Sequence, residues 1–137
     1  MNASQVWFRL ASVYFAVGVW MGVVMGGSGD HTLLPVHAHI NLLGWVSMAL
    51  FGLIAAVRPD LVAGRAARVH FWAYNLGVPV MLLALALRIK GVTAVEPVIG
   101  AGSVVVGLSV LIYCAMLLKG ARARGIAQAS TLAATSR

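Results

Sequence analysis

The stretch Pro35–Trp45 reads PVHAHINLLGW and places two imidazoles and a carboxamide at the start of a long apolar run. The run continues to Val57, which gives it close to the ~20 residues that an α-helix needs to cross a bilayer. Polar side chains are costly in lipid, and those found in a membrane-spanning helix usually serve a function. The sequence therefore predicts a transmembrane helix with a functional polar cluster at one end.

The composition of the whole chain points to the same environment. Its 137 residues are 61% hydrophobic and 9% charged, whereas a soluble domain is about 25% charged. The formal net charge is +7, and the basic residues lie between the apolar runs and in the C-terminal tail. This placement suits anionic lipid headgroups and argues against nucleic acid as a partner. We therefore expect an integral membrane protein surrounded by the lipid bilayer.

Four apolar segments predict an all-α bundle of four transmembrane helices. The predicted spans cover about residues 6–27, 35–57, 69–87 and 98–118, within one domain of residues 1–118. The first run has no Ala-x-Ala cleavage site, so we interpret it as a retained span rather than a signal peptide. Residues 119–137 form a basic tail that we expect to be mobile and cytoplasmic.

The distribution of basic residues predicts the orientation of these spans. Of the ten Lys and Arg residues, eight lie at the N-terminus, in the loop between the second and third spans, or in the tail. The other two, Arg88 and Lys90, follow the third span. The positive-inside rule then predicts a multi-pass protein of the inner (plasma) membrane with both termini in the cytoplasm. Pro35–Trp45 would lie near the outer surface.

Small residues recur at helical spacing in three of the spans. Gly18, Gly22 and Gly26 follow one another at intervals of four, Gly44 and Gly52 share a face, and so do Ser103 and Gly107. Such stripes let helix backbones approach closely in lipid. Packing inside one bundle and packing between protomers both remain open at this point.

The spacing of His37 and His39 restricts what they can bind. Two residues on an α-helix are separated by about 200° of rotation, so the two rings point to nearly opposite faces. They are poor joint ligands for one ion but suit two centres, and imidazole is a good ligand for haem iron and for copper. Alternatively, both bond water or headgroups at the interface. Asn41 could orient a ligand imidazole or bond across helices, and Trp45 could pack on a porphyrin or face lipid.

Other residues offer further ligands. His70 opens the third span at the opposite end of the bundle, and we expect it to be an interfacial residue. His39 and Val57 are 18 residues apart, or about 27 Å along a helix, so His39 and His70 cannot both ligate one haem within a chain.

Met21, Met25 and His31, together with His37 and His39, form a thioether–imidazole set that suits cuprous copper. The two methionines could equally be packing residues.

The motif His39-Ile40-Asn41-Leu42-Leu43 resembles the second helix of the large subunit of haem–copper oxidases, especially the nitric oxide reductase branch. In that family the histidine of His-x-Asn-Leu-Leu ligates the low-spin haem b. His37-Ala38-His39 is also similar to a His-x-His of a later helix, whose two histidines ligate different haems. His70-Phe71-Trp72 is similar to the start of a following helix. The family subunit contains three arcs of helices, whereas this chain has one arc and lacks the copper-site histidine pair.

This resemblance implies a b-type haem bound through His39, with His37, Asn41 and Trp45 close to it. A second axial ligand would come from another copy of the chain, in a trimer that mimics the three arcs or in a dimer with haem between protomers. The expected role is electron transfer or NO and O₂ binding, with a quinol or a respiratory enzyme as partner; an enzymatic activity would be that of an oxidoreductase. The alternatives are a copper-handling membrane protein and a cofactor-free assembly partner of a respiratory enzyme.

Overall fold

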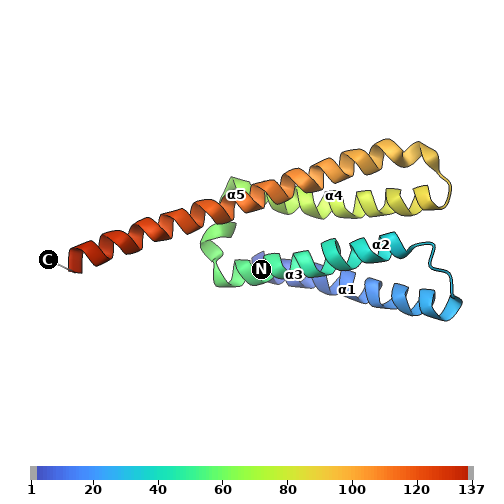
Figure 1. Ribbon diagram of the computed structural model, residues 1–137, viewed down its shortest axis with the longest axis horizontal. Coiled ribbons are helices and arrows are strands. Elements are labelled where there is room, and N and C mark those ends of the chain that lie inside the picture. Colours follow the sequence, from blue (N-terminus) through green and yellow to red (C-terminus); the bar gives the residue numbers. More distant parts are fainter. Residues whose placement is uncertain (1–2, 136–137) are drawn as a thin grey trace.

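The chain folds into two long helical hairpins that lie side by side (Figure 1). The computed structural model describes the backbone of residues 3–135 and the side chains of residues 3–61 and 63–120. The first hairpin consists of α1 (Ala3–Ser28) and a second helix in three parts: α2 (Leu34–His39), the π-helix η1 (Ile40–Ser47) and α3 (Met48–Val57). The second hairpin consists of α4 (Arg65–Ile89) and α5 (Glu96–Thr135), with the short 3₁₀ turns η2 (Pro59–Val62) and η3 (Thr93–Val95) before them.

Four helices are long and apolar enough to cross a membrane, which confirms the predicted all-α, multi-pass architecture. The spans are Ala3–Ser28, Leu34–Val57, Arg65–Ile89 and Thr93–Gly120. The backbone of α5 continues as a helix beyond the fourth span, through the basic tail, to Thr135. The tail predicted to be mobile and cytoplasmic covers residues 119–137, and its side chains after Gly120 lie outside the described part of the structure.

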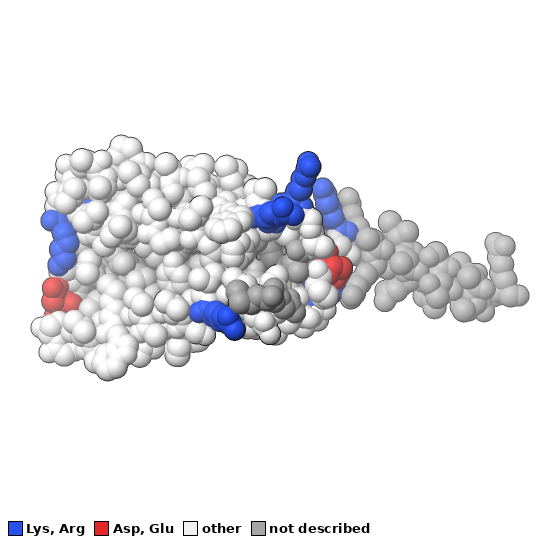
Figure 2. Space-filling view, turned by 180° about the vertical axis from the view of Figure 1, so that it is seen from behind, with Lys and Arg blue, Asp and Glu red and all other residues white. Residues whose placement is uncertain are grey.

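Charged residues occupy the two ends of the bundle. Figure 2 shows Lys, Arg, Asp and Glu side chains toward both ends, with a broad band between them that carries none in this view. Both hairpin loops lie at one end (Figure 1), where Arg88 pairs with Glu96. At the other end Arg58 binds Asp60 at 2.7 Å. The uncharged band is the surface that the apolar runs predict for the lipid-facing part of the molecule.

The loop of the first hairpin is shaped by local hydrogen bonds. Gly29 has a φ of 69°, a value that favours glycine, and its N–H donates to the Met25 carbonyl at 2.9 Å to end α1. The Asp30 carboxylate accepts hydrogen bonds from the backbone and side chain of Thr32, which lower the pKa of Asp30 below its ordinary value. Pro35 lies in the first turn of α2, which begins at Leu34, because its fixed φ suits that turn.

Glycines set the close approach of α1 to the second span. A Cβ atom on Gly44 would lie 2.2 Å from Cδ1 of Tyr14, and one on Gly18 would lie 2.7 Å from Oδ1 of Asn41. No side chain larger than hydrogen fits at either position without movement. By contrast, a Cβ on Gly26 or Gly107 would meet nothing within 4 Å. Of the two uses that the glycine stripes suggested, packing within the bundle is therefore confirmed for Gly18 and Gly44.

Candidate functional site

The second span changes its helical form directly after His39. Ile40–Ser47 is a π-helix, and π-helical turns occur mostly as single insertions, frequently at functional sites. Two side chains donate to carbonyl groups of this segment: the Ser47 hydroxyl to Leu42 at 2.7 Å and the Tyr74 hydroxyl to Leu43 at 3.0 Å. Side-chain donors of this kind satisfy backbone groups that an irregular helix leaves exposed in lipid. The segment is thereby held against α4.

His37 and Asn41 lie on the face of the second span that packs against α1. The Asn41 amide donates to the His37 carbonyl at 2.9 Å, and the same nitrogen lies 3.4 Å from Nε2 of the His37 ring. The His37 ring stands over Gly22, because a Cβ there would lie 3.2 Å from Cε1. Both side chains are half-buried. Their hydrogen bond lies within the second span, and the two side chains pack over Gly22 and Gly18 of α1.

His39 faces away from the bundle, as the two-residue spacing from His37 predicts. Its side chain is exposed, and its Nδ1 lies 2.7 Å from the carbonyl oxygen of Pro35. A carbonyl oxygen can only accept, so Nδ1 carries a proton, and in the neutral ring Nε2 keeps a lone pair. Histidines that bind metals use this arrangement, in which one ring nitrogen donates to a carbonyl and the other faces the metal.

Trp45 lies on the outer surface of the same span. It is 36% exposed, and its ring packs on Phe15 of α1 with ring centroids 4.2 Å apart. The two rings form an apolar surface on the outside of the first hairpin. A ligand held outside the bundle could contact this surface.

The five residues of the predicted copper set do not converge on one pocket. Met21 and Met25 line a shallow hollow at the end of α1 together with Asp30, and none of the three histidines of the set lines it. His31 is exposed in the loop, where its Nδ1 lies 3.0 Å from the Gly29 carbonyl. Within residues 3–120, no three His, Cys, Asp or Glu side chains are grouped as ligands for one ion.

His70 occupies a different environment from the one that its position in the sequence suggests. We expected an interfacial residue, but the side chain is only 3% exposed and is turned into the bundle. Its Nδ1 lies 2.8 Å from Oγ and 3.0 Å from the carbonyl oxygen of Ser109 on α5. Its ring lies 4.8 Å from Phe51 and 4.9 Å from Tyr113 between ring centroids. The expectation was wrong because α5 supplies a hydrogen-bond partner that pulls the imidazole inward.

A signal for this buried cluster was present in the sequence. His70 and Tyr74 are four residues apart on the third span, and Ser109 and Tyr113 are four apart on the fourth. Each pair therefore marks a polar and aromatic stripe on one helix face. The two stripes meet because α4 and α5 are antiparallel neighbours in one hairpin (Figure 1).

Comparison with known proteins gives no relationship for this chain. No family model matches the sequence, and neither the curated proteins nor the solved structures give a significant match. The functional argument therefore depends on the chemistry of the residues themselves.

Proposed function

We propose that the chain is a membrane-integral b-type haem protein in which His39 supplies one axial ligand. One observation carries this proposal. His39 is exposed on the outer face of its helix, and the Nδ1 contact with Pro35 at 2.7 Å leaves the lone pair on Nε2. Neutral imidazole held in this way is a common ligand of haem iron. The resemblance of the motif His39-Ile40-Asn41-Leu42-Leu43 to haem-ligating helices of haem–copper oxidases supports the same assignment.

The second axial ligand comes from another copy of the chain in this proposal. His39 faces outward, whereas His37 is packed against Gly22 of its own chain. Two exposed His39 side chains on adjacent protomers could face one another in a dimer, or around the axis of a trimer.

The residues around His39 have a positioning role. Pro35 fixes the ring orientation through its carbonyl, and on the opposite helix face His37 and Asn41 pack over glycines of α1. When bound, haem supplies either a one-electron iron couple or an open position for NO or O₂, depending on the second ligand. The positive-inside rule favours cytoplasmic termini and places His39 near the outer surface of the inner membrane. The redox partner in this proposal is a quinol or a respiratory enzyme.

The test is a comparison of matched histidine variants. The full chain is purified in detergent, and its reduced-minus-oxidised absorption spectrum is recorded. His39→Ala should remove the Soret band, whereas His31→Ala should retain it. His31 is a matched control because it is also exposed and its Nδ1 also lies near a carbonyl. Haem in a demonstrably monomeric preparation would refute the shared-ligand arrangement.

Two further outcomes separate the alternatives. A colourless protein that binds cuprous copper, and loses it in Met25→Ala, would replace the haem proposal with copper handling. A colourless protein that binds neither would leave the role of an assembly partner. Both outcomes are measured on the same preparation by metal analysis.

A further inference from the structure

The outward face of α4 begins with two arginines and continues directly with apolar side chains. Arg65, Arg68, Val69, Trp72 and Ala73 are spaced so that they lie on one side of the helix. Together they line a shallow hollow of ≈ 440 Å³, which we call the α4 hollow. Val69 is 53% exposed and Trp72 is 57% exposed. The α4 hollow therefore opens on the outside of the bundle, where the third membrane span begins.

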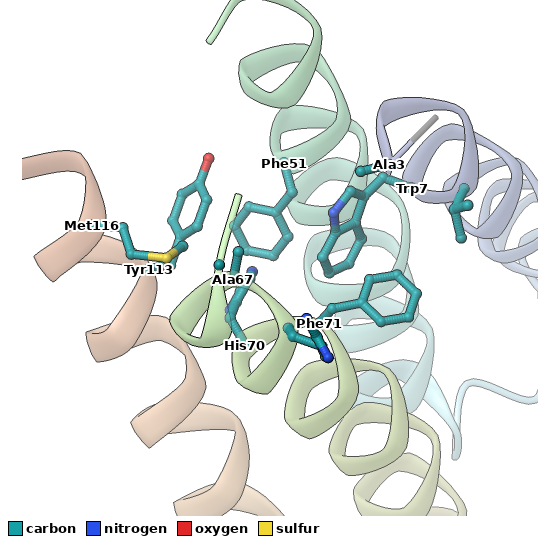
Figure 3. Close-up of a pocket in the computed structure, with 11 residues that line it drawn as sticks. Ala3, Trp7, Phe51, Ala67, His70, Phe71, Tyr113 and Met116 are labelled. Atoms are coloured by element: carbon teal, nitrogen blue, oxygen red, sulfur yellow. The ribbon is translucent and has the colours of Figure 1, made fainter. Parts of the chain in front are cut away.

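The inward face of α4 is filled by the protein itself. Figure 3 shows a pocket on that side, with His70 of α4 among the side chains of Trp7, Phe51 and Tyr113. The centroids of these three rings lie 4.8–5.5 Å from the centroid of the imidazole. The inward face thus belongs to the aromatic core. A ligand of α4 must approach from the outside of the bundle, where Trp72 is exposed.

The two arginines of the α4 hollow carry charge that the described acidic side chains do not neutralise. The chain has three Asp and Glu residues. Asp60 lies at this end of the bundle and binds Arg58 at 2.7 Å, whereas the other two lie by the hairpin loops at the opposite end. Among the described side chains, none forms an ion pair with Arg65 or Arg68. A negatively charged ligand would complement this pair.

We propose that the α4 hollow binds one anionic phospholipid, with its phosphate at Arg65 and Arg68 and an acyl chain along Val69 and Trp72. Guanidinium groups bind phosphate oxygens through paired, charge-assisted hydrogen bonds. Arg68 and Trp72 are four residues apart, or about 6 Å along the helix, so the charged and apolar contacts follow the order of head group and chain in a lipid. A soluble phosphate compound would leave the apolar part of the hollow uncovered.

The charge of the α4 hollow favours an anionic lipid over a zwitterionic one. The head group of phosphatidylglycerol carries only the negative charge of its phosphate, whereas that of phosphatidylcholine adds a quaternary ammonium. This cation would lie beside Arg65 and Arg68, with no acidic side chain among the residues that line the hollow. Each basic side chain at a membrane surface favours anionic lipid by about fivefold, which gives about 25-fold for two. The site shares no residue with the haem proposal, so each can be tested without the other.

The experiment is a fluorescence titration of the full chain in micelles of a neutral detergent. The probes are phosphatidylglycerol and phosphatidylcholine with dibrominated acyl chains, because bromine quenches tryptophan fluorescence only at short range. The chain has four tryptophans, and the signal of Trp72 is obtained as the difference from a Trp72→Phe variant. We expect saturable quenching of Trp72, with half-saturation at about 25-fold lower concentration for phosphatidylglycerol.

Charge variants locate the effect. Arg65→Gln and Arg68→Gln should each lower the preference for phosphatidylglycerol about fivefold, and the double variant should abolish it. Both side chains are exposed, so these variants should fold. Lys119→Gln is the control, because Lys119 is also exposed and lies at the same end of the bundle but does not line the hollow. This variant should keep the full preference.

Four results would each overturn the proposal. Equal quenching by the two lipids would mean that only unselected bilayer lipid covers the hollow. A loss of preference in Lys119→Gln as large as in Arg65→Gln would mean that the whole basic end attracts anionic lipid without a site. A preference that inorganic phosphate removes at constant ionic strength would identify a soluble phosphate ligand. A Trp72 signal that neither lipid quenches would mean that another protein chain covers this face.

Discussion

Alanine substitutions at Gly18, Gly22 and Gly26 should have graded effects on stability, although all three belong to one stripe of α1. The nearest neighbours of an added Cβ are Oδ1 of Asn41 at 2.7 Å for Gly18 and Cε1 of His37 at 3.2 Å for Gly22. Gly26 has nothing within 4 Å. The three positions thus share a helix and a spacing but differ in what they contact.

The expected magnitudes follow from these distances. Gly18→Ala forces the Asn41 amide to move, which costs about 1–3 kcal/mol for overpacking and about 0.5–1.5 kcal/mol for the hydrogen bond to the His37 carbonyl. Replacing a mid-helix glycine returns roughly 0.5–1 kcal/mol. The net destabilisation is therefore about 0.5–4 kcal/mol for Gly18→Ala. Gly22→Ala should be near neutral, because the neighbouring ring need shift by only a few tenths of an ångström, and Gly26→Ala should be neutral or stabilising.

The assay is reversible unfolding in mixed detergent micelles, followed by helicity and tryptophan fluorescence. A difference of about 1.4 kcal/mol changes the folding equilibrium tenfold, so the three variants should separate clearly. In an Asn41→Ala background the cost of Gly18→Ala should shrink, because the clashing atom is gone. If Gly26→Ala is as destabilising as Gly18→Ala, the stripe packs against a second protomer and the reasoning from Asn41 fails.

Two other predictions concern a buried hydroxyl and an exposed loop. Tyr74→Phe leaves the Leu43 carbonyl without its side-chain donor and should destabilise the protein by about 1–3 kcal/mol in the same unfolding assay. Tyr113→Phe is the control and should not, since its hydroxyl has no protein partner; equal losses would contradict this. Asp30 should titrate below its ordinary 3.8, because the Thr32 side chain and backbone donate to its carboxylate. The pKa of Asp30 is lowered in the folded state, so the ionised carboxylate stabilises the folded loop above pH 3.8. This stabilisation is lost as the pH falls through the lowered pKa. A nuclear magnetic resonance titration should show the midpoint moving toward 3.8 in Thr32→Val, and an unmoved midpoint would rule out the Thr32 hydroxyl as the main cause.

The four spans could be predicted from the sequence because lipid imposes a simple length and polarity requirement. The boundaries were less accurate. The third span was expected from about residue 69, yet α4 begins at Arg65. Arg65 and Arg68 are good helix formers, so the helix continues into the headgroup region beyond the apolar run. An apolar run marks the part of a helix that lipid covers and not the whole helix.

The candidate site could be predicted only where one helix determines it. The opposed directions of His37 and His39 follow from 100° of rotation per residue, a property of any α-helix. The π-helix after His39 has no comparable signal, because it depends partly on Tyr74 of another helix reaching the Leu43 carbonyl. The burial of His70 likewise depends on Ser109, which is 39 residues away in sequence. Residue spacing marks the polar and aromatic stripes on α4 and α5, but it does not encode how the two helices pack, which decides whether the stripes meet.

A hydrogen bond from Nδ1 leaves Nε2 of a neutral histidine able to bind a ligand, but it does not determine which ligand binds. His31, His39 and His70 all place Nδ1 about 3 Å or less from a carbonyl oxygen, so the neutral ring of each keeps its lone pair on Nε2. Their surroundings differ: His31 lies in an exposed loop, His39 faces outward from a membrane span, and His70 lies in an aromatic pocket. His31 is open to solvent, His39 is open to a ligand or protomer outside the chain, and Nε2 of His70 is enclosed by the rings around it. His39 and His70 thus lie near opposite ends of one bundle, and of these two only His39 presents Nε2 to a ligand outside the chain.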